Sequence, residues 1–181
     1  IRAGETVAIF GAGGGLGIHM VMMAKWAHAN VIAVEIASDK FSACLKAGAD
    51  ECVNPRAGDA AEALRDLSGG GVDVTIDFVS SRETLEIAVQ CLGRGGRMVT
   101  LGGSGEDFSA SAQIMLEKEL ILKGSRYATR QEVKDSLKLC ARGEVWPLIT
   151  ETATLEGAED LHARIEKGLV TGRAAIIIQS P

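Results

Sequence analysis

The sequence predicts an α/β fold: a doubly wound, parallel, six-stranded sheet with helices on both of its faces. Three observations favour this fold. Short β-rich segments alternate with helical patterns along the chain. Several of the β-rich segments are nearly continuous apolar runs, as expected of strands covered on both faces. The chain has 181 residues, 46% of them apolar and 24% charged, which is typical of one globular domain.

Six segments have the composition of strands, and the first is followed at once by a glycine-rich turn. In a doubly wound sheet the strand order reverses beside the first strand, so we expect a ligand crevice there. The predicted strands are residues 6–10, 31–35, 51–54, 72–79, 97–102 and 119–124.

Helical patterns separate these strands. The first is apolar almost all round, which predicts a deeply buried helix. The second opens at Ser38 and closes at Gly48, as helix caps do. These predicted helices are residues 15–28, 38–47, 59–67, 81–92 and 111–117.

Residues 127–181 contain two further helical patterns, 130–142 and 155–167, and a final apolar run, 174–179. No repeat or Pro/Gly/Ser-rich linker separates them from residues 1–126. We therefore expect a single domain, with a sheet core in residues 1–126 and helices and a last strand in residues 127–181.

The segment TVAIFGAGGGLG, residues 6–17, leads from a predicted strand into a predicted helix. Such a helix presents free backbone N–H groups and the positive end of its dipole, and glycines let a pyrophosphate approach them. The spacing is A-x-G-x-x-G, with Ala12 in the first position, so a flexible turn without a ligand remains an alternative. The glycines concerned are Gly11, Gly13, Gly14, Gly15 and Gly17.

Glu35 ends the second predicted strand, 18 residues after Gly17. A dinucleotide site uses an acid at this place to accept hydrogen bonds from the adenosine ribose. The same carboxylate would repel a 2′-phosphate by about 1 kcal/mol in water-like surroundings and about 4 kcal/mol at a surface-like dielectric. The sequence therefore predicts NAD rather than NADP, although an ordinary solvated carboxylate is the alternative.

Several segments together resemble one protein family. GETVAIFGAGGGLG, VIAVEIASDKFSACLKAGADECVN, GGVDVTIDFV, GRGGRMVTLGG and GLVTGRAAIII occur in this order. They resemble the zinc-containing alcohol dehydrogenases of the medium-chain dehydrogenase/reductase family. The resemblance covers essentially all 181 residues but only the C-terminal, NAD-binding half of such an enzyme, which has a Rossmann fold.

The resemblance implies a role for residues around the adenosine and the diphosphate. Gly15 and Leu16 fit the positions whose amides hold the pyrophosphate, and Arg173 fits an arginine that reaches back to it. Lys40 fits a lysine that contacts the same ribose as Glu35. On the residues alone, a solvated helix lysine is the alternative for Lys40, and a surface arginine before a strand is the alternative for Arg173.

The resemblance also implies which residues surround the two rings of the cofactor. Phe78 and Val79, at the end of the fourth predicted strand, fit the walls around adenine. The residues that fit positions beside the nicotinamide and its ribose are Leu101, Gly102, Ser125 and Arg126.

The sequence departs from this family at the metal site. The family holds its catalytic zinc upstream of the glycine turn, where this chain has only ten residues and none is Cys, His or Asp. We therefore expect no catalytic and no metal-binding residue here, an N-terminal catalytic domain that is missing, and zinc only in that domain. His19 and His28 are expected to be packing or surface residues, and the four scattered cysteines small buried residues.

The predicted function is the NAD-binding domain of an oxidoreductase that transfers a hydride between an alcohol or carbonyl substrate and NAD, with the domain by itself inactive. Alternatives are the cofactor domain of a zinc-free quinone or enoyl reductase, a non-catalytic nucleotide-sensing module, and a methyltransferase. The net charge of −5 and the absence of a long apolar run argue against nucleic acid and membrane partners. A cytoplasmic location and a homodimer or homotetramer, paired through an apolar edge strand at 119–124, are expected.

Overall fold

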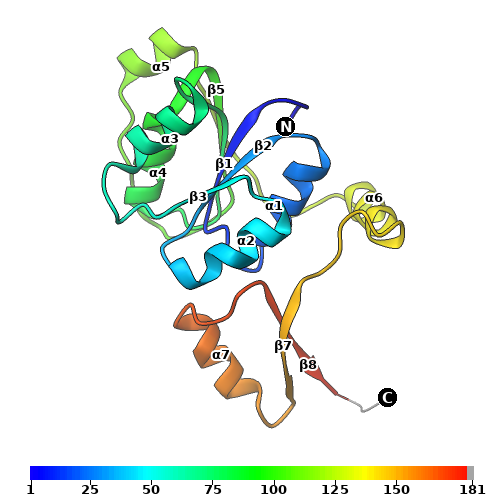
Figure 1. Ribbon diagram of the computed structural model, residues 1–181. Helices are drawn as coiled ribbons and strands as arrows, with labels where there is room; N and C mark the ends of the chain where they lie inside the picture. The colour runs from blue at the N-terminus through cyan, green and yellow to red at the C-terminus, as the bar shows by residue number, and fades with distance from the viewer. Residues whose placement is uncertain (179–181) are drawn as a thin grey trace.

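The computed structural model describes residues 1–178. Its main sheet has six strands in the order β3-β2-β1-β4-β5-β6, and every neighbouring pair is parallel. The order reverses beside β1, which confirms the predicted doubly wound α/β fold (Figure 1). The strands are β1 (Thr6–Phe10), β2 (Asn30–Val34), β3 (Glu51–Val53), β4 (Val72–Asp77), β5 (Leu92–Thr100) and β6 (Ile121–Gly124).

Helices cover both faces of this sheet. Alternate residues of β1 enter two separate cores: Ala8 and Phe10 pack on the side of α3 and α4, and Val7 and Ile9 on the side of α1 and α2 (Figure 1). The helices are α1 (Gly17–Trp26), α2 (Phe41–Ala47), α3 (Ala60–Ser68), α4 (Arg82–Gln90), α5 (Ala112–Lys118), α6 (Arg130–Ala141) and α7 (Ala158–Glu166), and a 3₁₀ turn, Ser38–Lys40, precedes α2.

Four helices begin with a side chain that accepts a hydrogen bond from the backbone of the first turn. In α6 the bond is reciprocal, because Glu132 also accepts from the backbone of Thr129. Helix α1 has no such side-chain cap and begins directly after the glycine turn. The capping residues are Asp59 (α3), Ser81 (α4), Ser111 (α5) and Thr129 (α6).

Several predicted boundaries differ from the structure. Helix α1 is shorter than predicted and is buried along only part of its surface, since its last residue, Trp26, is half exposed. Strand β5 begins at Leu92 rather than at residue 97, because the chain turns from α4 into the sheet at Cys91, before its run of glycines. Strand β6 begins at Ile121, because Glu119 adopts a left-handed conformation that ends α5.

The C-terminal part contains a strand that the sequence did not predict. β7 (Ile149–Thr154) pairs in parallel with β8 (Arg173–Ile177), and α7 connects them. This β-α-β unit lies beside the carboxyl end of the main sheet (Figure 1). β8 confirms the predicted final strand, of which Gln179 lies outside the described residues.

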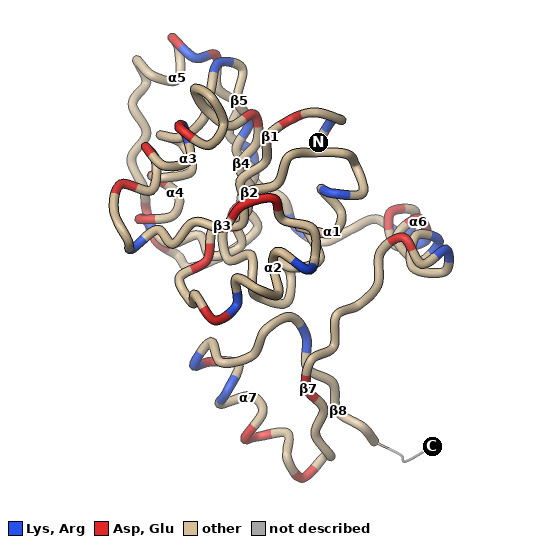
Figure 2. The backbone as a smooth tube through the Cα atoms, in the orientation of Figure 1, with Lys and Arg blue, Asp and Glu red and all other residues tan. Residues whose placement is uncertain are grey.

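Charges of both signs lie side by side on the outer helices, as on α6 and α7 (Figure 2). Within residues 1–178, no helix is long and apolar enough to cross a membrane. Of the cysteines, Cys44 and Cys91 are buried as predicted, and burial raises the pKa of each to about 12, whereas Cys52 is half-buried and Cys140 is exposed.

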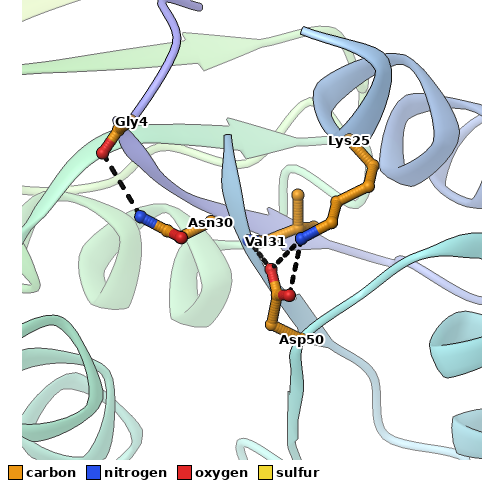
Figure 3. A network of polar contacts seen from close by, with 5 residues as sticks. All are labelled: Gly4, Lys25, Asn30, Val31 and Asp50. Atoms are coloured by element: carbon orange, nitrogen blue, oxygen red, sulfur yellow. Dashed lines mark hydrogen bonds and ion pairs between the residues drawn. The ribbon is translucent and has the colours of Figure 1, made fainter. Parts of the chain in front are cut away.

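A polar network fixes the end of the sheet opposite the glycine turn (Figure 3). The Lys25 ammonium, in the last turn of α1, donates to both carboxylate oxygens of Asp50, at 2.6 and 2.8 Å. Asp50 also accepts from the amide of Val31 at 2.8 Å, and the Asn30 side chain donates to the carbonyl of Gly4 at 3.3 Å. The network thereby joins α1 to the beginnings of β2 and β3.

Candidate functional site

The glycine turn brings the start of α1 into close contact with the end of β1. Gly11 has a φ of 71°, in the left-handed region that glycine adopts without strain. Its amide donates to Val34 at 2.9 Å, which fixes the turn to β2. A Cβ on Gly17 would lie 2.1 Å from the carbonyl oxygen of Gly11, so only glycine permits this approach.

Three successive amides at the beginning of α1 are free. The amides of Gly15, Leu16 and Gly17 donate to no atom of residues 1–178, whereas that of Gly14 donates to Gly11 at 3.1 Å and that of Ile18 to Gly14 at 3.0 Å. Free amides at a helix N-terminus carry the positive end of the helix dipole. This end of α1 can therefore receive an anion.

The free amides border a cavity of about 360 Å³. Every one of its lining residues was among the candidates drawn from the sequence. Two of them, Lys40 and Arg173, are cationic, and Glu35 supplies a carboxylate. The lining residues are Gly11, Gly14, Gly15, Leu16, Gly17, Glu35, Lys40, Phe78, Val79 and Arg173.

Glu35 is 7% exposed and holds the backbone around it. One of its carboxylate oxygens accepts from the Gly13 amide at 2.9 Å, and the other accepts from the Ala37 amide at 3.1 Å. A Cβ on Gly13 would lie 2.9 Å from the first oxygen, so Gly13 supports the carboxylate rather than lining the cavity. Each carboxylate oxygen has a second lone pair for a ligand hydroxyl.

Lys40 is buried, with 6% of its surface exposed, although on the residues alone a solvated lysine was an alternative. Its ammonium donates to the carbonyl of Val170 at 2.9 Å, which ties the 3₁₀ turn before α2 to the segment before β8. An ammonium has three donors, so two remain available toward the cavity.

Arg173 reaches the cavity because the chain returns to the glycine turn before β8. The amide of Gly172 donates to the carbonyl of Gly13 at 3.0 Å. A Cβ on Gly15 would lie 3.1 Å from the Cδ and Nε of Arg173, so the guanidinium lies beside Gly15.

A second cavity, of about 320 Å³, adjoins the first through Gly11, Glu35 and Val79. It contains residues that the sequence analysis missed, among them Ile36, which follows β2, and Arg56, which follows β3. The carboxyl ends of parallel strands meet at one edge of a sheet. The positions of Ile36 and Arg56, each soon after a predicted strand, are therefore the signal that could have identified them.

Asp77 shapes the wall between these cavities. It is fully buried at the end of β4, and one of its oxygens accepts from the amides of Val79 at 2.7 Å and Ser80 at 3.0 Å. The other accepts from the hydroxyl of Thr84 at 2.8 Å. These bonds hold the turn that carries Phe78 and Val79.

The candidates for the nicotinamide side are less closely grouped. Leu101 and Ser125 line a third cavity, of about 430 Å³, which shares Phe78 with the first. Gly102 packs against Ser80 instead, since a Cβ on it would lie 2.5 Å from the Ser80 hydroxyl. Arg126 lies over the ring of Tyr127, 4.8 Å from its centroid, and lines none of these three cavities.

The family model described as "Zinc-binding dehydrogenase" matches residues 15–142 of this chain. The chain belongs to the zinc-binding dehydrogenase family. An alcohol dehydrogenase of Geobacillus stearothermophilus is 35% identical over 97% of this chain and 51% of its own length. An NAD-dependent alcohol dehydrogenase of Saccharolobus solfataricus is 32% identical over 96% of the chain and 50% of its own length.

Other zinc-binding dehydrogenase relatives carry out different reactions. An acryloyl-coenzyme A reductase of Sulfurisphaera tokodaii is 30% identical over 97% of the chain and 52% of its own length.

The crystal structure of the alcohol dehydrogenase of Aeropyrum pernix superposes with a TM-score of 0.88 at 32% identity, over 96% of this chain and 50% of that one. The chain thus spans about half the length of these relatives. These relatives are all oxidoreductases.

The metal named in the family's description has no donor set in this part of the molecule. Residues 1–178 contain no group of three or more His, Cys, Asp or Glu side chains that could hold a metal ion. His19 lies at the glycine turn and binds backbone atoms, whereas His28 and His162 are exposed.

Proposed function

We propose that the chain is the NAD-binding domain of an alcohol dehydrogenase-like oxidoreductase that transfers a hydride between an alcohol and NAD. The observation that supports this most directly is the cavity at α1, where three free amides and two cations face a buried carboxylate. A diphosphate carries negative charge for the amides and cations, and an attached ribose carries hydroxyls that can donate to the carboxylate. When bound, the nicotinamide supplies the carbon that accepts or gives the hydride.

The residues of this cavity bind and orient the dinucleotide. The amides of Gly15, Leu16 and Gly17 donate to the diphosphate, and the guanidinium of Arg173 can pair two of its oxygens. The free lone pairs of Glu35 accept from the ribose hydroxyls, and its charge opposes a 2′-phosphate. We therefore propose that the site prefers NAD to NADP.

The two neighbouring cavities receive the rings. Val79, Ile36 and Arg56 line the second cavity, which we propose for adenine, whereas Phe78, expected at adenine from the sequence, lines the first and third cavities instead. Leu101 and Ser125 border the nicotinamide end, and we propose that Gly102 and Arg126 contribute to it through their backbone. We propose that the alcohol, and any zinc that would polarise it, are held by residues other than those of this chain.

A reductase of coenzyme A esters or quinones is a second candidate, because the relatives include an acryloyl-coenzyme A reductase. Both reactions use the same dinucleotide site and differ in the acceptor of the hydride. We propose the alcohol as substrate because most of the similar relatives reported above are alcohol dehydrogenases. An assay of the full-length enzyme with alcohols and with enoyl-coenzyme A esters would decide between them.

Calorimetric titration of the purified chain with NAD⁺, NADP⁺ and S-adenosylmethionine tests the cofactor. We expect NAD⁺ to bind, NADP⁺ to bind at least about tenfold more weakly, and S-adenosylmethionine not to bind measurably. Arg173→Leu should weaken NAD⁺ binding about tenfold, whereas Arg142→Leu, at an exposed arginine paired with Glu144, should not. Equal affinity for the two dinucleotides, or none for NAD⁺, would reject the proposal.

A further inference from the structure

His19 joins the glycine turn to a segment far along the chain. It lies in the first turn of α1 and is half-buried. Its Nδ1 lies 2.8 Å from the carbonyl oxygen of Gly15, and the amide of Leu148 lies 2.9 Å from its Nε2. A backbone amide can only donate, so Nε2 accepts, and the proton of the neutral ring is on Nδ1, which donates to Gly15.

The His19 ring takes the place of a backbone amide at the Gly15 carbonyl, because α1 makes no backbone hydrogen bond there. The carbonyls of Gly14 and Leu16 accept the amides of Ile18 and Met20, each at 3.0 Å, whereas the carbonyl of Gly15 between them accepts the imidazole. The Gly15 carbonyl and the Leu16 amide belong to one planar, trans peptide, so they point in opposite directions. A ring that fixes the carbonyl on one side therefore fixes the free amide on the other, toward the cavity.

The bond to Leu148 leads to the second group at the cavity. The carbonyl of Leu148 accepts the amide of Arg173 at 2.9 Å, and the neighbouring Gly172 donates to Gly13 at 3.0 Å. A Cβ on Gly172 would lie 2.9 Å from that same Leu148 carbonyl, so the two segments are in close contact. The position of Arg173 thus depends on Leu148, and Leu148 is held by the imidazole.

We propose that His19 is a positioning residue of the dinucleotide site, whose neutral Nδ1-protonated ring aims the Leu16 amide and, through Leu148, the Arg173 guanidinium at the same diphosphate. The proposal rests on the proposed function, because it names the two groups of that site which the ring controls. It assigns to His19 one of the contacts, beside that of Gly172 with Gly13, that couple the glycine turn to the C-terminal segment.

The test uses variants that keep one bond each. In His19→Asn the side-chain amide can still donate near the place of Nδ1 but no longer reaches Leu148, and in His19→Gln a carbonyl oxygen can accept near the place of Nε2. We expect His19→Leu to raise the Kd for NAD⁺ about tenfold and each amide variant to recover part of the loss. His28→Leu and His162→Leu, at exposed histidines, should leave the Kd within about twofold.

A double-mutant cycle separates positioning from general stability. If His19 acts through Arg173, His19→Leu should cost clearly less in an Arg173→Leu background, and the remaining loss reports the Leu16 amide. A purely structural role would weaken binding by the same factor in both backgrounds, which would overturn the coupling to Arg173.

The ¹⁵N NMR signals of the His19 ring give a readout that needs no ligand and no variant. We expect a protonated Nδ1 and an unprotonated Nε2 at neutral pH, and the opposite tautomer would overturn the inference. If the wild-type chain binds NAD⁺, and the His19→Leu and His19→Gln variants bind it as tightly as the wild type does, the inference fails while the proposed function stands. If the wild-type chain binds no NAD⁺, the proposed function fails and takes the inference with it.

Discussion

The Glu35 carboxylate has two tasks at the level of a single residue. It accepts the amides of Gly13 and Ala37 on different oxygens, and it faces the place proposed for the adenosine ribose. Both tasks need two acceptor oxygens, but only the repulsion of a 2′-phosphate needs the charge. A substitution that keeps the shape and removes the charge therefore affects both tasks, and each effect needs its own measurement.

For Glu35→Gln we expect a loss of discrimination between NAD⁺ and NADP⁺ of about tenfold, since the neutral amide no longer repels the 2′-phosphate. We also expect the free energy of unfolding to fall by about 1–3 kcal/mol, because the glutamine NH₂ cannot accept one of the two backbone amides. Calorimetry with both cofactors and urea unfolding measure the two effects. Unchanged discrimination in a folded variant would show that Glu35 does not select the cofactor.

At the level of residues, the sequence correctly predicted which side chains meet where their meeting follows from local spacing. Glu35 and the glycines are separated by a distance that the β-α-β unit fixes, so their meeting was predictable. The partners of Lys40 and His19 are Val170 and Leu148, about 130 residues further on, and backbone atoms carry no sequence signal. Such contacts depend on the path of the whole chain and were not predictable from the residues.

At the scale of one element, Glu119 ends α5 in a conformation that suits glycine. Its φ is 55°, which costs a residue with a Cβ about 1 kcal/mol. The ion pair that it makes with Arg94 at 2.7 Å joins side chains that are 77% and 64% exposed, so its contribution is small. Glu119→Gly should therefore raise the free energy of unfolding by about 0.5–1 kcal/mol, as measured in urea. Glu119→Ala, which loses the ion pair and keeps the strained conformation, should give no gain.

The network that joins α1 to β2 and β3 should make stability depend on pH. Burial alone would raise the pKa of Asp50, but hydrogen bonds from Lys25 and Val31 and the Lys25 charge outweigh it and hold this pKa below its ordinary value. A group with a lowered pKa stabilises the fold above its unfolded-state pKa, and this contribution is lost as the pH falls through the folded-state value.

We therefore expect Asp50→Asn to lower the free energy of unfolding at pH 7, by no more than about 1 kcal/mol because both partners are partly exposed. The difference from wild type should shrink as the pH falls below about 4. Urea unfolding between pH 7 and pH 2.5 measures it, with Asp66→Asn, at an exposed position on α3, as the control. A difference that stays constant with pH would contradict the account.

Elements were predictable where apolar residues dominate. The strands β1, β2 and β4 are almost entirely buried and read as apolar runs. β7 was missed because its residues, ITETAT, are mostly polar and none of them is buried. Its pairing with β8 comes from the backbone alone, so the pattern of apolar residues contained no signal for it.

At the scale of the whole molecule, β6 is one of the two edge strands of the main sheet in the described part of the chain, and β3 is the other. β6 pairs only with β5, and Ile121 at its beginning is 55% exposed. An exposed apolar edge strand offers unpaired backbone groups to another chain. The net charge of −5, divided over surfaces of mixed sign, is small enough to permit two copies to approach.

We expect the protein to form dimers or tetramers through β6, with the backbones of two copies extending one sheet. Ile121→Lys should shift it toward the monomer, because two lysines would face each other across the new pair of strands and lose water there. Light scattering after size exclusion, over a range of concentrations, measures the mass. Leu67→Lys, which adds the same charge on α3 at a leucine that is 48% exposed, should leave the mass unchanged. A protein that is monomeric without substitution, or an assembly that Ile121→Lys does not weaken, would contradict the pairing of two copies through β6.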